Sequence, residues 1–171
     1  MKIDNFETDR FIVKKFSLKF INKNYLDWFN DCEVNKFITF NPKNLDDLKN
    51  DVLKTLKLKN AYFFAIFHKK KHIGNIKIHN IDYQQNKAWL GILIGDKNFR
   101  GIGVTPEIVK FIKISLIKKK IYFLRLNVDK KNIQAIKSYL KSGFVVEKTH
   151  NNFYTMRANI YPKKIILGLA Q

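Results

Sequence analysis

Cysteine and proline are scarce in this sequence, whose 171 residues include one cysteine, Cys32, and three prolines. A lone cysteine excludes a disulfide bond within the chain and suits a reducing compartment. The first residues, MKIDNFETDR, carry acidic side chains and lack the apolar core of a signal peptide, and no run reaches the roughly 18 apolar residues of a membrane span. We therefore expect a cytoplasmic protein without a membrane span.

Acidic residues are also few, 14 against 33 lysines and arginines, and the formal net charge is +19. Nearly all of the basic residues are lysines, they are spread along the whole chain, and Asn, Ile and Phe are abundant too. This pattern favours a base-composition bias of the coding genome, with the steering of anions as a by-product. The alternative is a functional basic surface for an anionic partner such as CoA, a nucleotide-linked substrate, nucleic acid or membrane lipid.

The common nucleotide-binding motifs GxGxxG and GxxxxGK[ST] are absent, so a dinucleotide-binding fold and a nucleoside triphosphate loop are poor fits. The chain does contain Gly91–Thr105, GILIGDKNFRGIGVT, in which an apolar strand enters a glycine turn. Gly101 and Gly103 allow positive φ and close approach of a ligand. The amides that open the next helix and the guanidinium of Arg100 favour phosphate as that ligand. Thr105 is predicted to cap this helix, with Pro106 at its first position.

Apolar periodicity predicts a mixed α/β chain without repeats or linkers, and so one domain over residues 1–171. Helices are expected at 18–30, 44–60, 106–119 and 132–141, with a short helical turn at 31–37. Strands are expected at 7–16, 61–67, 72–79, 87–95, 121–128, 144–146 and 153–160, the boundary near 77–83 being soft. Gly143 is expected to end the last helix.

A second block, from Asn132 to Phe144, follows the glycine turn after a helix and a strand. The two blocks together resemble the GNAT superfamily of acetyl-CoA-dependent N-acetyltransferases. Its signature is Arg/Gln-x-x-Gly-x-Gly/Ala, then Asn-x-x-Ala/Ser-x-x-x-Tyr, then Gly-Phe. The matching residues are Arg100, Gly103, Asn132, Ala135, Tyr139, Gly143 and Phe144, and Thr105 stands where the family usually has Gly or Ala.

The resemblance implies an α/β (α+β) domain with a mostly antiparallel sheet of about seven strands, a splayed parallel pair and about four helices. It implies acetyl-CoA as co-substrate, a primary amine as acceptor and no metal. The cofactor would lie against Leu93, Ile94, Gly95, Arg100, Gly101, Ile102, Gly103, Val104, Thr105 and Asn132. Tyr139, two helical turns after Asn132, would be the catalytic acid that protonates the departing thiolate.

Within the superfamily the front half resembles the RimJ/RimL-like branch, through Glu7–Phe11, Trp28–Val34 and His72–Lys77. Many relatives have a glutamate as general base where this chain has Trp89. The base is therefore left open among His72, His79, Asp82 and Glu107.

The missing glutamate favours an acceptor amine of low basicity. We predict a nucleotide-linked amino sugar or similar small amine first, a protein N-terminus second, and lysine side chains last. Two other classes stay open, a nucleic-acid-binding module and a non-catalytic acyl-CoA-binding relative, although no nucleic-acid-binding motif is present. The oligomeric state is not predicted.

Overall fold

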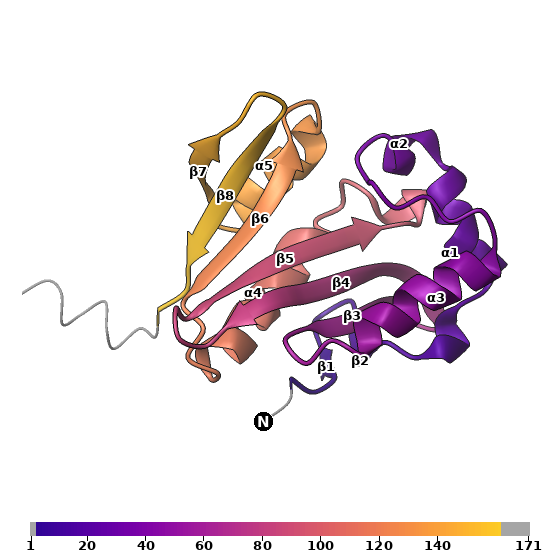
Figure 1. Ribbon diagram of the computed structural model, residues 1–171, viewed down its shortest axis with the longest axis horizontal. Coiled ribbons are helices and arrows are strands. Elements are labelled where there is room, and N and C mark those ends of the chain that lie inside the picture. Colours follow the sequence, from indigo (N-terminus) through magenta and orange to yellow (C-terminus); the bar gives the residue numbers. More distant parts are fainter. Residues whose placement is uncertain (1–2, 162–171) are drawn as a thin grey trace, which may run out of the picture.

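The computed structural model describes residues 3–161, which build one sheet of eight strands in the order β1-β2-β3-β4-β5-β6-β8-β7 (Figure 1). The strands are β1 (Phe6–Glu7), β2 (Ile12–Lys15), β3 (Tyr62–His68), β4 (Lys71–Asp82), β5 (Lys87–Ile94), β6 (Phe123–Asp129), β7 (Val145–Thr149) and β8 (Phe153–Asn159). Every neighbouring pair is antiparallel except β5 and β6, which are parallel. The predicted mixed, mostly antiparallel sheet with one parallel pair is confirmed.

The strand predicted at 7–16 is two strands, which raises the count to eight. Thr8 interrupts it, because its hydroxyl accepts a hydrogen bond from the Phe11 amide at 3.0 Å and its own amide donates to the Phe11 carbonyl at 2.8 Å. This turn folds β2 back on β1. The side chains of Thr8 and Arg10, in this turn, contact Glu107 at the start of α4.

The helices are α1 (Lys23–Asp27), α2 (Cys32–Asn35), α3 (Leu45–Leu56), α4 (Val104–Ile117) and α5 (Ile133–Lys141). The helix predicted at 18–30 is broken into a 3₁₀ turn at Leu18–Phe20, α1, and a second 3₁₀ turn at Trp28–Asn30. The break comes at Ile21, which is extended, and Asn22 then starts α1 by accepting a hydrogen bond from the Tyr25 amide.

The sheet separates two hydrophobic cores. Residues of α4 and α5 pack on one face with most of the sheet, including Ile108, Ile112 and Tyr139. Residues of α1, α3 and the aromatic segment between α1 and α2 pack on the other face, including Trp28 and Leu48. Figure 1 shows α3 on the near side of the strands and α4 behind them.

The parallel pair of strands is short. Only Lys87, Ala88 and Trp89 of β5 pair with β6, opposite Phe123, Leu124 and Arg125, and the strands then separate. In Figure 1 the β6-β8-β7 part leans away from β5, and α2 lies on the other side of the opening. The predicted splayed pair is therefore present.

No helix within residues 3–161 is long and apolar enough to cross a membrane. The same residues contain no cluster of three or more His, Cys, Asp or Glu side chains that could hold a metal ion. Cys32, at the start of α2, is a free and exposed thiol.

Candidate active site

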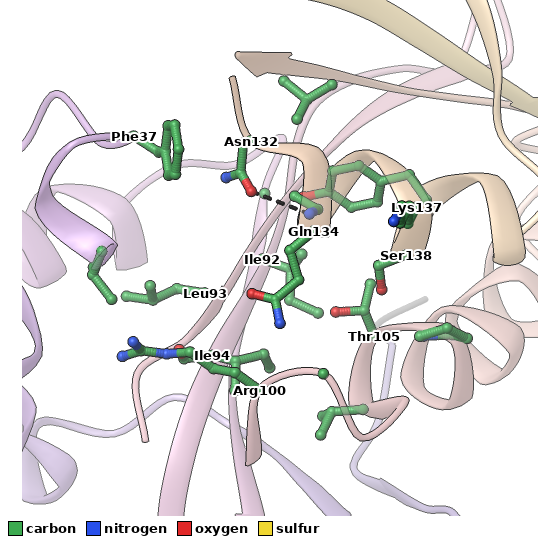
Figure 2. Close-up of a pocket in the computed structure, with 18 of the residues that line it drawn as sticks. Phe37, Ile92, Leu93, Ile94, Arg100, Thr105, Asn132, Gln134, Lys137 and Ser138 are labelled. Atoms are coloured by element: carbon green, nitrogen blue, oxygen red, sulfur yellow. Dashed lines mark hydrogen bonds between the residues drawn. The ribbon is translucent and has the colours of Figure 1, made fainter. Parts of the chain in front are cut away.

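A pocket of about 470 Å³ lies in the opening between β5 and β6 (Figure 2). Its walls come from β5, the turn after it, the first turn of α4, one face of α5, the end of β6 and the segment that begins at α2. This volume is within the usual range of small-molecule sites. The glycine turn and the Asn132–Tyr139 block, far apart in the sequence, meet in this pocket.

The glycine turn adopts the predicted conformation, with φ of 76° at Gly101 and 84° at Gly103. Helix α4 begins directly after it, at Val104, with Gly103 as the residue before the helix. The prediction that Thr105 caps the helix is wrong, because the left-handed Gly103 turns the chain into the helix without a side-chain cap. Thr105 instead lies inside the first turn, 9% exposed.

The first amides of α4 have no carbonyl partner within the helix, as in any α-helix. Pro106, the third helical residue, has no N–H to leave unpaired. The amides of Val104 and Thr105 are thus donors at the positive end of the helix dipole, and both residues line the pocket. This arrangement can bind an anion.

Hydrogen bonds from the segment between β1 and β2 hold the glycine turn in place. Glu107 of α4 accepts hydrogen bonds from the Thr8 hydroxyl at 2.6 Å and from Arg10 Nε at 2.7 Å, and Arg10 Nη1 donates to the Ile102 carbonyl at 3.1 Å. Burial acts to raise the pKa of Glu107, but these hydrogen bonds outweigh it and hold the pKa below its usual value. Glu107 is therefore a bound carboxylate that orients the turn.

The guanidinium of Arg100 is engaged by the protein. Its Nε donates to the Ile94 carbonyl at 3.0 Å, its Nη2 donates to the Gly95 carbonyl, and its Nη1 pairs with Asp31 at 2.8 Å. The Glu33 amide and then Arg100 hold the pKa of Asp31 below its usual value. Arg100 thus fastens the end of β5 to the start of α2, whereas the sequence had assigned this fork of donors to phosphate.

The three predicted cofactor-contacting residues at the end of β5 differ in position. Leu93 and Ile94 line the pocket, and Gly95 does not. The Gly95 amide donates to the Ile73 carbonyl at 3.0 Å. The carbonyl oxygen of Ile94 already accepts a hydrogen bond from Arg100. Of the three residues, Leu93 therefore has the backbone groups that are most available to a cofactor.

Helix α5 supplies the opposite wall. Asn132 caps it, because its Oδ1 accepts a hydrogen bond from the Ala135 amide at 3.1 Å, shown dashed in Figure 2. The Asn132 side-chain amide nitrogen is left at the pocket. Gly143, with φ of 77°, ends the helix as predicted.

Tyr139 lies two turns along α5 and lines the same pocket, 8% exposed. Its ring packs edge-on against Phe144, with ring centres 5.8 Å apart. Burial raises the pKa of Tyr139 to about 12, so the hydroxyl keeps its proton at neutral pH. None of the described residues forms a hydrogen bond with this hydroxyl, which leaves it available to a ligand.

The pocket joins the two faces of the sheet. Along β5, Leu90 and Ile92 pack with the α4 core, and Leu93 packs with the α1–α3 core. Because side chains alternate along a strand, Gly91 lies on the α1–α3 face. On β6, Leu126 and Val128 belong to the α4 core, and the same alternation places Asn127 on the face of Gly91.

Several pocket residues were not predicted. They are Glu33, Phe37, Ile38, Asn127, Asp129, Gln134, Lys137 and Ser138. Figure 2 shows Thr105, Lys137 and Ser138 on one side and Phe37 on the other. Asn127 is oriented, since its Oδ1 accepts from the Thr155 hydroxyl at 2.8 Å. Asn127 and Asp129 carried a signal in the sequence, as polar residues alternating with apolar ones along β6. Glu33 lay in the Trp28–Val34 block, and Gln134, Lys137 and Ser138 lay in the block from Asn132 to Phe144.

None of the four candidate bases lines this pocket. Glu107 is bound by Thr8 and Arg10, and Asp82 accepts hydrogen bonds from the amides of Gln84 and Gln85. His72 and His79 lie on β4, where burial lowers the pKa of each. The described structure thus identifies no direct base among them.

A helix start that can bind an anion, an open strand edge and a protonated tyrosine in one cleft are features that suit an acyl-CoA-dependent transferase. The family model for the acetyltransferase (GNAT) domain matches residues 10–145. The chain therefore belongs to the GNAT acetyltransferase family and is an acyltransferase with acetyl-CoA as its co-substrate. No curated protein matches the sequence significantly.

Solved structures share the fold at low sequence identity. One is RimL, a ribosomal L7/L12 α-N-protein acetyltransferase in complex with CoA, with TM-score 0.80, 12% identity, and coverage of 92% of this chain and 98% of that one. A second is spermidine N-acetyltransferase from Vibrio cholerae in complex with CoA and spermine, with TM-score 0.70, 17% identity, and coverage of 88% and 96%. A third is the microcin C7 self-immunity acetyltransferase MccE with acetyl-CoA and AMP, with TM-score 0.75, 19% identity, and coverage of 89% and 93%.

Proposed function

We propose that this protein transfers the acetyl group of acetyl-CoA directly to the primary amine of a small molecule, with Tyr139 as general acid. The observation that carries the proposal is the position of Tyr139, whose unpaired hydroxyl lies in the cleft between the separated strands, beside the turn that starts α4. Gly101, Gly103, Val104 and Thr105 would hold the pyrophosphate through backbone amides. Ile102 and Arg100 would shape that turn rather than contact the phosphates.

The pantetheine arm of CoA carries amide groups and would lie along the open edge of β5 at Leu93 and Ile94, like an added strand. The Asn132 side-chain amide would contact the same arm from α5. The thioester would then lie near Tyr139.

In the reaction, the neutral amine attacks the thioester carbon, a C–N bond forms and the C–S bond breaks. The amine loses one proton and the CoA sulfur gains one, so the reaction is balanced. Tyr139 supplies that proton to the sulfur, whose parent thiol resembles cysteine with a pKa of about 8.5, and its phenol is restored from solvent. With none of the four candidate bases in the pocket, water would take the amine proton.

Within the family we place the protein in the RimJ/RimL-like branch, which is supported by the Thr8–Arg10 motif and its contact with Glu107. The acceptor predicted from the sequence, a nucleotide-linked amino sugar ahead of a protein N-terminus, stays a prediction. A small-molecule acceptor is supported by the limited pocket volume, which the cofactor arm must share.

The test is the Tyr139→Phe variant, which keeps the ring against Phe144 and removes only the hydroxyl. We expect turnover to fall by about 10²- to 10⁴-fold and acetyl-CoA affinity to change little. Because the pKa of Tyr139 is about 12, its hydroxyl stays protonated between pH 7 and 10. The turnover of the parent protein should therefore not fall over this range through deprotonation of Tyr139. Parent-like turnover of Tyr139→Phe would refute the assigned role, and absence of acetyl-CoA binding by the parent would refute the function.

A further inference from the structure

Gly91 is a glycine that the packing of the protein does not require. It lies inside β5 opposite Lys77 of β4, in a regular part of the ladder, and it is not among the glycines with positive φ. A Cβ at this position would meet only the Cβ of Lys77, at 3.9 Å, which is an ordinary contact. The nearby Gly95 differs, because a Cβ there would lie 1.8 Å from the Trp28 ring.

Glycine weakens a strand interior, and apart from bulges and bends it often marks a place where a ligand or another backbone approaches closely. Gly91 lines the pocket on the face of the sheet that α1 to α3 cover. The neighbouring Lys77 side chain leads away toward α3, where its Nζ donates to the Thr55 hydroxyl at 3.2 Å. The surface above Gly91 is therefore left bare for a ligand.

The wall of the pocket that begins at α2 contributes one acidic side chain and several apolar ones, although the protein carries a net charge of +19. It includes Glu33, Phe37 and Ile38 from the segment that begins at α2. The positive charge of Arg100 is neutralised by its ion pair with Asp31. The lysines that line the pocket, Lys137 and Lys141, belong to α5 on the opposite wall.

The carboxylate of Glu33 pairs with Lys36 at 2.7 Å, and both side chains are largely exposed, 64% and 46%. Such a surface pair contributes little stability, so a ligand cation can join or replace Lys36 at small cost. Glu33 and Tyr139 come from opposite walls of the cleft, α2 and α5. A positive group held by Glu33 is therefore separate from the nitrogen that reacts beside Tyr139.

We propose that Gly91 and Glu33 form the acceptor subsite, and that it takes a small amine with a second, non-reacting positive charge. The reacting amine lies over Gly91, an apolar spacer packs on Phe37 and Ile38, and the second cation pairs with Glu33. This proposal rests on the proposed function and narrows it. It replaces the weakly basic, anionic nucleotide-linked amino sugar predicted from the sequence by a strongly basic, cationic acceptor, whose reacting amine must lose a proton to water before it attacks.

The first test compares three primary amines with four carbons each and different groups at the far end: 1,4-diaminobutane, butylamine and 4-aminobutyrate. We expect kcat/KM to be at least about 10-fold higher for the diamine than for butylamine, and lowest for the aminobutyrate. Glu33→Gln should remove the advantage of the diamine over butylamine. Lys36→Met is the matched control, because it breaks the same ion pair but keeps the carboxylate, and it should preserve the preference.

The second test is the pair Gly91→Ala and Gly91→Val. Both should fold, since the space is open within the protein. KM for the diamine should rise by about 10-fold or more, further in Val than in Ala, and acetyl-CoA affinity measured by calorimetry should stay within about twofold.

Equal kcat/KM for the three acceptors, or unchanged selectivity in Glu33→Gln, would overturn the inference. Faster acetylation of a nucleotide-linked amino sugar would also overturn it, while the proposed function would stand. Faster acetylation of a peptide N-terminus would overturn both the inference and the small-molecule acceptor of the proposed function. Absence of both acetyl-CoA binding and transfer to any of these amines would overturn the proposed function itself.

Discussion

Trp28 occupies the space that a side chain at position 95 would need. A Cβ added to Gly95 would lie 1.8 Å from Cδ2 of the Trp28 ring. That ring is 8% exposed and packs edge-on against Tyr25 and His72, at centre distances of 5.0 and 4.8 Å. The end of β5 and the aromatic core beneath α1 are therefore fitted to each other.

Gly95→Ala should consequently destabilise the protein, because the buried ring cannot move away without disturbing its neighbours. We expect a loss of about 1–3 kcal/mol in the free energy of unfolding, measured by urea denaturation. Gly91→Ala, inside β5, is the control and should be neutral or stabilising by about 0.5–1 kcal/mol. Equal effects of the two substitutions would show that the ring contact is unimportant.

Arg100 and Asp31 should behave as one unit. In a double-mutant cycle with Arg100→Ala and Asp31→Ala, we expect a coupling energy of about 1 kcal/mol in urea denaturation. The partly exposed positions of both side chains keep this value modest. If Arg100→Ala instead loses acetyl-CoA affinity with no change in stability, the arginine contacts phosphate as the sequence had suggested.

A side chain at Gly103 should fill the space of the pyrophosphate. Gly103→Val is expected to lower acetyl-CoA affinity by about 100-fold or more in calorimetry. Gly103→Asn should show the same direction with less backbone strain, because asparagine tolerates the left-handed conformation. Gly143→Val is the control, since it carries similar strain away from the turn and should still bind acetyl-CoA.

His72 should make stability sensitive to acid. Its Nε2 lies 2.8 Å from Asn75 Oδ1 and 3.1 Å from the Gly74 carbonyl, which assigns the proton to Nε2. Burial lowers the pKa of His72 from the usual 6.5, although these hydrogen bonds oppose the shift. Below pH 6.5 the His72 imidazole therefore binds a proton more readily in the unfolded chain than in the folded protein. The stability that is present above pH 6.5 is lost as the pH falls through the pKa of the folded state.

The urea midpoint of the parent should accordingly drop between pH 7.5 and 5. His72→Phe, which keeps an aromatic ring in the cluster, should show a smaller drop over the same range. A parent midpoint independent of pH would mean that the folded protein accommodates the charged imidazole.

Much of the fold could be predicted from local patterns in the sequence. Helices α4 and α5 have apolar faces at helical spacing, and the left-handed Gly101, Gly103 and Gly143 stand where the chain needs positive φ. The strand that ends at Ile94 and the Asn132 cap were likewise predictable from neighbouring residues. These features depend on contacts a few residues apart.

The remainder depends on partners distant in the sequence. Arg100, predicted to contact phosphate, forms an ion pair with Asp31, and Gly95, predicted to contact the cofactor, lies against the Trp28 ring. Likewise, the N-terminal Thr8 meets Glu107, 99 positions later. No local pattern reports such contacts, because tertiary packing alone creates them.

The short ladder between β5 and β6 also has a consequence for amide exchange. Beyond Trp89, the edge of β5 that faces away from β4 has no strand partner among the described residues, so the sheet contains an unpaired edge at its centre. Exposed edges usually invite pairing with another chain. Here an extended cofactor would complete the ladder, so acetyl-CoA should slow deuterium uptake in the segment 90–94 and leave the amides of 87–89 almost unchanged.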